Sequence, residues 1–98
     1  MPTFDRLALF KREYRRLTPE QQARFKVAVA KLIAALKPNA PRVPGEPLVN
    51  PLAGHRGVYE LRFAPDGRAT FTFAPPVREG KPHVIWRRIG GHEVLDRP

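Results

Sequence analysis

The strongest structural signal in the chain is GVYELRFAPDGRATFTF, residues 57–73. Its first half places Tyr59, Leu61 and Phe63 on one side of an extended chain, because successive side chains of a strand point to opposite faces. Pro-Asp-Gly at residues 65–67 is a turn signal, and the second half alternates again with phenylalanines at 71 and 73. This stretch predicts a β-hairpin with one aromatic face and one polar, basic face.

A third strand is expected after the hairpin. A second turn is predicted at residues 78–81, and residues 83–89, HVIWRRI, carry apolar side chains on both faces, as a deeply buried strand does. Two glycines at 90 and 91 end this strand. Residues 2–6 can add a short edge strand to the same sheet.

Two helices are predicted before the hairpin. Apolar residues at 7, 10, 14 and 17 form one helical stripe. The second helix begins at Thr18, where Thr18 can cap, Pro19 suits the first helical position and Gln21 can complete a capping box. That helix runs to about Leu36 and is stopped by Pro38.

The segment at residues 38–51 carries prolines at 38, 41, 44, 47 and 51, so a stiff connecting surface loop is predicted there. The expected fold class is α+β, with two N-terminal helices packed on one face of a small antiparallel sheet. The 98 residues are expected to form a single domain, 1–98.

The composition points to a polyanionic partner. Eighteen Lys and Arg against nine Asp and Glu give a formal charge of +9. No cysteine is present, which excludes a disulfide framework and a thiolate nucleophile, and the three histidines lack a zinc spacing. No metal or cofactor is expected.

The start of the chain lacks the pattern of a signal peptide, and the apolar run at residues 27–36 is too short for a membrane span, so a cytoplasmic protein with no membrane partner is expected.

The order and spacing of four segments resemble the RelE/ParE toxin family, and within it the histidine-using, YafQ-like branch. FKREYRRL at residues 10–17 resembles the first helix of the family, and NPLAG at residues 50–54 resembles the segment that enters the sheet. Residues 57–73 resemble its two hairpin strands. IGGHEVL at residues 89–95 resembles the closing motif of the histidine-using branch.

The resemblance implies the toxin of a toxin–antitoxin pair, an endoribonuclease that works without metal on mRNA in the ribosomal decoding site. In such enzymes the ribose 2′-hydroxyl attacks the adjacent phosphate, which leaves a cyclic phosphate on one product and a 5′-hydroxyl on the other. A cognate antitoxin would hold the toxin inactive and would be its link to operator DNA. Two alternatives remain open: a ParE-like inhibitor of DNA gyrase, and a basic nucleic-acid-binding module without catalysis.

The reaction needs a base, charge stabilisation at the phosphate and an acid for the leaving oxygen. His92 is the candidate acid, because histidine titrates near neutrality. Arg62 and Arg68 are candidates for the phosphate, which guanidinium groups bind in a two-pronged geometry. Asp66 is a candidate base or an orienting partner of His92, or simply a turn residue. Glu60 is an alternative base, or a salt-bridge partner of Arg62.

The resemblance also has two gaps. Asn50 stands where the histidine-using branch tends to carry a histidine, and no tyrosine follows Tyr59.

Trp86 can stack on a base of RNA, although a place in the core is the more common role of such an aromatic residue. His83 is expected only to end a strand. The basic surface expected to contact RNA comprises Lys11, Arg12, Arg15, Arg16, His55, Arg56, Arg87 and Arg88, with Trp86 added if its ring is open to solvent.

Overall fold

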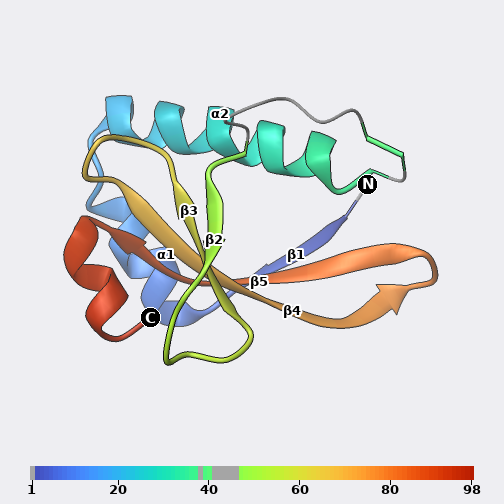
Figure 1. Cartoon of the computed structure of the whole chain (residues 1–98). Coiled ribbons are helices and arrows are strands. Elements are labelled where there is room, and N and C mark those ends of the chain that lie inside the picture. The colour runs from blue at the N-terminus through green and yellow to red at the C-terminus, as the bar shows by residue number, and fades with distance from the viewer. Residues whose placement is uncertain (1, 38, 41–46) are drawn as a thin grey trace.

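The computed structural model describes residues 2–37, 39–40 and 47–98 (Figure 1). Along the chain these form β1 (Thr3–Arg6), α1 (Ala8–Arg15), α2 (Pro19–Ala35), β2 (Val49–Pro51), β3 (Val58–Arg62), β4 (Arg68–Arg78), β5 (Lys81–Gly90) and a short 3-10 helix, η1 (His92–Asp96). The strands make one five-stranded sheet in the order β1-β5-β4-β3-β2. The predicted α+β fold and the predicted N-terminal edge strand are confirmed; β1 runs parallel to β5, and the other neighbours are antiparallel.

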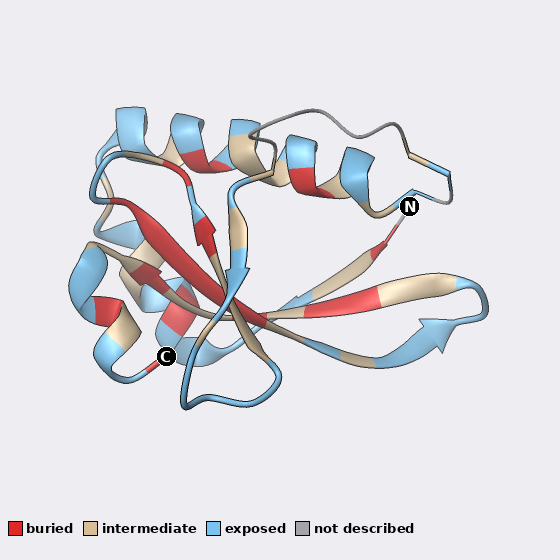
Figure 2. Cartoon of the chain, in the orientation of Figure 1, coloured by how far each residue is buried: buried red, intermediate tan, exposed pale blue. Residues whose placement is uncertain are grey.

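The helices cover most of the aromatic face of the hairpin, whereas Phe73 on the same face stays 44% exposed. Phe10 of α1 and Phe25 of α2 pack with Leu61, Phe71 and Trp86 of the sheet in one core cluster. Figure 2 shows the buried positions of α2 on its sheet-facing side. Burying such aliphatic and aromatic side chains stabilises the fold by roughly 1.5–3 kcal/mol each. The core therefore follows from the period-two pattern read along the two hairpin strands.

The start of α2 has the structure that its sequence predicts. The Thr18 hydroxyl accepts a hydrogen bond from the Gln21 amide at 3.1 Å, and the Gln21 side chain accepts one from the Thr18 amide at 2.8 Å. This capping box satisfies two of the amide groups that a helix start leaves without partners. The helix then ends at Ala35, one residue before the predicted end.

The predicted connecting loop at residues 38–51 needs one correction. Its last residues form β2, an edge strand that pairs with β3, whereas residues 38 and 41–46 lie outside the described residues. Pro51 pairs with Tyr59 in this strand. A proline is tolerated there because an edge strand has one side on which no backbone hydrogen bond is required.

The β4–β5 hairpin is longer than predicted. The two strands are paired up to Ala74 opposite His83, with a one-residue shift of register between Thr70 and Phe71, and pairing resumes only at Arg78 opposite Lys81. Pro75 and Pro76 fall within this interruption, because a proline has no amide hydrogen to donate to the partner strand. The hairpin tip therefore projects beyond the regular part of the sheet (Figure 1).

The polar face of the sheet is less open than the sequence predicts. Thr70 is fully buried, and its hydroxyl donates to the carbonyl of Pro98 at 3.4 Å. The Arg87 side chain donates to the same carbonyl at 3.0 Å, and Val94 of η1 is buried. The chain after β5 therefore folds back over part of the polar face. Within the described part of the chain, no helix is long and apolar enough to cross a membrane.

Candidate active site

The polar side chains singled out in the sequence gather at one end of the sheet. Arg62 of β3 pairs in register with Arg68 of β4, and Arg68 pairs with Gly90 of β5. The turn between β3 and β4 carries Asp66 to this same end, and η1 begins there with His92. Because these segments meet at adjacent strand ends, residues far apart in the sequence form one cluster. Glu60 lies two residue pairs further into the sheet, opposite Thr70.

Asp66 fixes the backbone at His92. One carboxylate oxygen, Oδ1, accepts a hydrogen bond from the His92 amide at 3.2 Å. The other, Oδ2, lies only 2.6 Å from the position that a Cβ atom at Gly91 would occupy. A side chain at position 91 would therefore push Asp66 away. His92 itself is exposed, so its imidazole is accessible to a substrate.

Glu93 is a second acidic neighbour of this junction that the sequence analysis did not single out. Its Oε1 accepts a hydrogen bond from the Gly91 amide at 3.2 Å, and its carboxylate would also collide with a Cβ at Gly91. The glycine pair at 90 and 91 was the sequence signal that could have pointed to Glu93, because paired glycines mark a place where other groups approach the backbone closely. Gly91 is thus enclosed by two carboxylates, one from the turn and one from η1.

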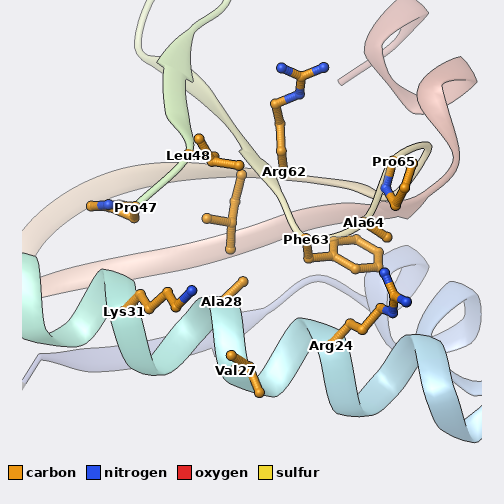
Figure 3. Close-up of a pocket in the computed structure, with 11 residues that line it drawn as sticks. Arg24, Val27, Ala28, Lys31, Pro47, Leu48, Arg62, Phe63, Ala64 and Pro65 are labelled. Atoms are coloured by element: carbon orange, nitrogen blue, oxygen red, sulfur yellow. The ribbon is translucent and has the colours of Figure 1, made fainter. Parts of the chain in front are cut away.

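Arg62 is exposed at the end of β3. Its amide donates to the carbonyl of Leu48 at 2.9 Å, which fixes the backbone against the edge of the sheet. Figure 3 shows its guanidinium directed away from α2 and into the open. An arginine with a fixed backbone and an exposed guanidinium is suited to binding a phosphate group.

Arg68 does not have the exposure that a phosphate ligand needs. The residue is only 4% exposed, and its Nη1 donates to the carbonyls of Ala64, Pro65 and Gly67 at 3.2, 3.3 and 2.9 Å. The expectation that this guanidinium reaches RNA therefore needs correction. Alternation along β4 correctly gives the face on which Arg68 lies, but it does not show that the preceding turn folds over the side chain.

Glu60 is paired with Arg68 and not with Arg62, the partner considered from the sequence. Its Oε2 lies 3.6 Å from Arg68 Nε, and the side chain is 14% exposed. That oxygen is buried and has no hydrogen-bond partner among the described residues. A carboxylate so enclosed is poorly placed to take a proton from a ribose hydroxyl, because the ribose cannot reach Oε2 without displacing its neighbours.

The residues expected to contact RNA divide into two groups. On α1 and in the loop before β3 the side chains are exposed. Arg88 is half-buried and donates to both carboxylate oxygens of Glu13, at 3.2 and 2.7 Å. This hydrogen bonding to Glu13 raises the pKa of Arg88 above its ordinary value, so Arg88 is a fixed cation. The exposed members of the predicted RNA surface are Lys11, Arg12, Arg15, Arg16, His55 and Arg56, whereas Arg87 and Arg88 are half-buried beside the C-terminal segment.

Trp86 and His83 are both structural. The Trp86 ring, 3% exposed, packs against the rings of Phe10, Phe25 and Phe71, so it cannot stack on a base. His83 is buried in β5 and bridges to β1. Its Nδ1 lies 2.6 Å from the Thr3 hydroxyl and its Nε2 3.0 Å from Asp5 Oδ2.

A groove adjoins the site on the helix side. It measures about 340 Å³ and lies between α2 and the ends of β2 and β3 (Figure 3). Val27 and Leu48 are exposed at its walls, and Leu61 and Phe63 form its apolar floor. Arg62 also lines it, so the groove and the cluster around His92 share the end of β3.

The comparisons with known proteins rest on structure. No family model and no curated protein matches the sequence. A chain of the DinJ–YafQ toxin–antitoxin complex of E. coli is similar, with a TM-score of 0.66 and 16% identity over 96% of each chain. YafQ of E. coli gives a TM-score of 0.63 and 15% identity, over 97% of this chain and 98% of that one. A chain of the RelB–RelE antitoxin–toxin complex of Methanococcus jannaschii gives 0.61 and 11% identity over 94% of each chain. The protein therefore has the fold of the RelE and YafQ toxins.

Proposed function

We propose that this chain is the toxin of a toxin–antitoxin pair and an endoribonuclease that cleaves ribosome-bound mRNA. The observation that carries the proposal is the exposed His92, held through its backbone by Asp66 at the same end of the sheet as the exposed Arg62. This arrangement offers a proton donor and a phosphate-binding cation on adjacent strand ends. The fold shared with RelE and YafQ supports the same reading.

The proposed reaction uses the chain's own groups. The ribose 2′-oxygen attacks the neighbouring phosphorus, and the bond from phosphorus to the 5′-oxygen breaks, which leaves a 2′,3′-cyclic phosphate. Arg62 stabilises the charge that develops on the phosphate oxygens. Protonated His92 gives its proton to the departing 5′-oxygen, so the second product ends in a 5′-hydroxyl. No step is assigned to a metal.

The base that accepts the 2′-hydroxyl proton is best sought at Asp66. Its carboxylate is exposed in the turn and adjoins His92, whereas the Glu60 oxygen nearest Arg68 is buried. Asn50, exposed in β2 and paired with Glu60, has no basic group to offer. Asp66 would thus combine two tasks, holding the His92 backbone through Oδ1 and accepting the 2′-hydroxyl proton on its exposed carboxylate.

The partners in this proposal are a cognate antitoxin, the ribosome and mRNA, in the cytoplasm. The similar chains come from complexes named for a toxin and its antitoxin, RelB–RelE and DinJ–YafQ. A formal charge of +9 suits both ribosomal RNA and an acidic protein segment. Contact with operator DNA would occur only through the antitoxin.

The test is growth arrest on induced expression. His92→Ala and Arg62→Ala should each relieve the arrest without lowering the melting temperature, because both side chains are exposed. Arg24→Ala is the matched control, since Arg24 is an exposed arginine on α2 at the far side of the groove. It should leave the arrest unchanged. Arrest that persists in both site variants would refute the assignment, and double-strand breaks in DNA would indicate gyrase inhibition.

A further inference from the structure

The turn between β3 and β4 is organised by a buried cation. Arg68 Nη1 has two hydrogens and three carbonyl acceptors, those of Ala64, Pro65 and Gly67, at 2.9 to 3.3 Å. All three belong to the turn, so their carbonyl groups converge on one nitrogen. Charged donors make stronger hydrogen bonds than neutral donors, which makes this convergence a specific restraint on the shape of the turn.

The turn is also held from the side of the core. The Phe63 amide donates to the Gly67 carbonyl at 3.2 Å, and the Gly67 amide donates to Ala64 at 3.1 Å. A Cβ atom at Gly67 would lie 2.6 Å from the Phe63 ring, so the backbone there packs directly on a core side chain. Between Arg68 and Phe63 the turn has little freedom to move.

Asp66 is the residue that this rigid turn presents. Its carboxylate binds the His92 amide at 3.2 Å and rests against Gly91. The start of η1 therefore takes its position from the turn, and the turn takes its shape from Arg68. A chain of contacts runs from a buried arginine to the backbone of the candidate acid.

Glu60 is the ion-pair partner of Arg68, and burying its carboxylate costs folding free energy. Its Oε2 is buried without a hydrogen-bond partner in the described structure and lies 3.6 Å from Arg68 Nε. Burying a carboxylate in this way disfavours folding, and apolar side chains of similar volume would fill the place as well or better. The pair is therefore better explained by what Arg68 holds in place than by stability.

We propose that Arg68 is a positioning residue for His92, acting through the turn and Asp66, and that Glu60 serves as its counter-charge. Arg68 does not touch the RNA. The effect on catalysis rests on the proposed function, whereas the effect on the His92 backbone does not. Displacement of a general acid by as little as 1 Å can lower a rate on the order of 10²-fold.

The decisive variant replaces the whole ion pair, Glu60→Leu with Arg68→Met. Removal of both charges together avoids leaving one buried and unpaired, so the double variant is expected to fold. The first readout is hydrogen exchange at the His92 amide by NMR, which should lose its protection. Asp66→Ala should cause the same loss, and adding it to the double variant should cause no further change. Arg24→Met, which removes an exposed arginine from α2, should leave the His92 amide protected.

The second readout is cleavage of mRNA on programmed ribosomes. A positioning role predicts that kcat falls on the order of 10²-fold while KM stays the same, because no contact with RNA is lost. A raised KM with unchanged kcat would instead identify Arg68 as a phosphate ligand and overturn the proposal. Undiminished protection of the His92 amide in the folded double variant would overturn it as well. If the parent protein cleaves no RNA, the proposed function fails, and the amide measurement alone still decides the positioning role.

Discussion

At the scale of single residues, the closest packing at the site is around Gly91. Its backbone φ of −83° is one that any residue can adopt, so conformational freedom does not explain the glycine. The glycine is explained by lack of space, because a Cβ atom at position 91 would collide with the Glu93 carboxylate and with Asp66 Oδ2. The geometry at His92 thus depends on the absence of one carbon atom at its neighbour.

Gly91→Ala should therefore displace Asp66 and release the His92 amide. We expect a loss of about 0.5–1.5 kcal/mol in the free energy of unfolding, the usual net worth of a hydrogen bond, because the atoms that a Cβ meets are the ends of two exposed carboxylates that can move aside. RNA cleavage should be lost. Urea unfolding would measure the stability, hydrogen exchange the release of the His92 amide, and an mRNA cleavage assay the loss of activity. Gly80→Ala is the control: its Cβ would meet no atom, but its φ of +72° costs an alanine about 1–2 kcal/mol. The control should be destabilised and keep the His92 amide protected; the same behaviour in Gly91→Ala would contradict this account.

Residue roles were the hardest part to predict from the sequence. The pattern placed Arg62 and Arg68 on the same face, and that is correct, because side-chain alternation follows from strand geometry. Exposure depends on what packs above a face, which for Arg68 is its own preceding turn and for Trp86 is the helix pair. The contact between Asp66 and His92 joins residues 26 apart, and no local pattern encodes it.

At the scale of secondary-structure elements, one buried histidine adds to the backbone pairing and the Phe4–Trp86 stacking that hold β1 against β5. β1 joins the sheet only through β5, and His83 of β5 contacts Thr3 and Asp5 of β1. Side-chain contacts of this kind add to the backbone pairing of a strand that has no neighbour on its other side. No local sequence pattern predicts the contact between His83 and Asp5, because most of the chain separates the two residues.

His83→Leu should loosen β1 while leaving the rest of the sheet intact. Loss of these hydrogen bonds is expected to lower the free energy of unfolding by about 1–3 kcal/mol. Exchange of the β1 backbone amides with solvent should quicken, whereas the amides of β3 and β4 should stay protected. Thr3→Val removes only one of the two contacts and should have a smaller effect. Equal exchange of β1 in the parent and in His83→Leu would show that the histidine does not hold the strand.

Elements with strong periodicity were predicted well, and the misses have physical causes. The capping box and the hairpin follow from local chemistry, and both are present. β2 was missed because three residues with a proline give no periodic signal. The end of β4 was missed because Pro75 and Pro76 interrupt its pairing with β5, which resumes at Arg78.

At the scale of the whole molecule, the excess of positive charge should govern the affinity for RNA. Each phosphate contact that is lost should reduce the slope of log affinity against log salt by roughly 0.7 for single-stranded RNA. The triple variant Lys11→Gln, Arg12→Gln, Arg15→Gln removes exposed charges from α1. It should bind more weakly and show a shallower salt dependence in a filter-binding titration.

The matched control removes the same charge from α2 and the turn that follows it, with Arg24→Gln, Lys26→Gln and Lys37→Gln, all at exposed positions. Its salt slope should stay close to that of the parent if α1 lies against the RNA. Equal slopes in the two triple variants would mean that net charge alone sets the affinity and that α1 forms no binding surface.

The central claim is that the exposed His92, set in place by Asp66, cleaves mRNA on the ribosome. The most direct measurement maps RNA ends on translated transcripts incubated with the purified protein, using a ligation that requires a 5′-hydroxyl. The parent should produce new 5′-hydroxyl ends phased with the codons, and His92→Ala should produce none. Transcripts left intact by the parent, or cut equally by His92→Ala, would contradict the account.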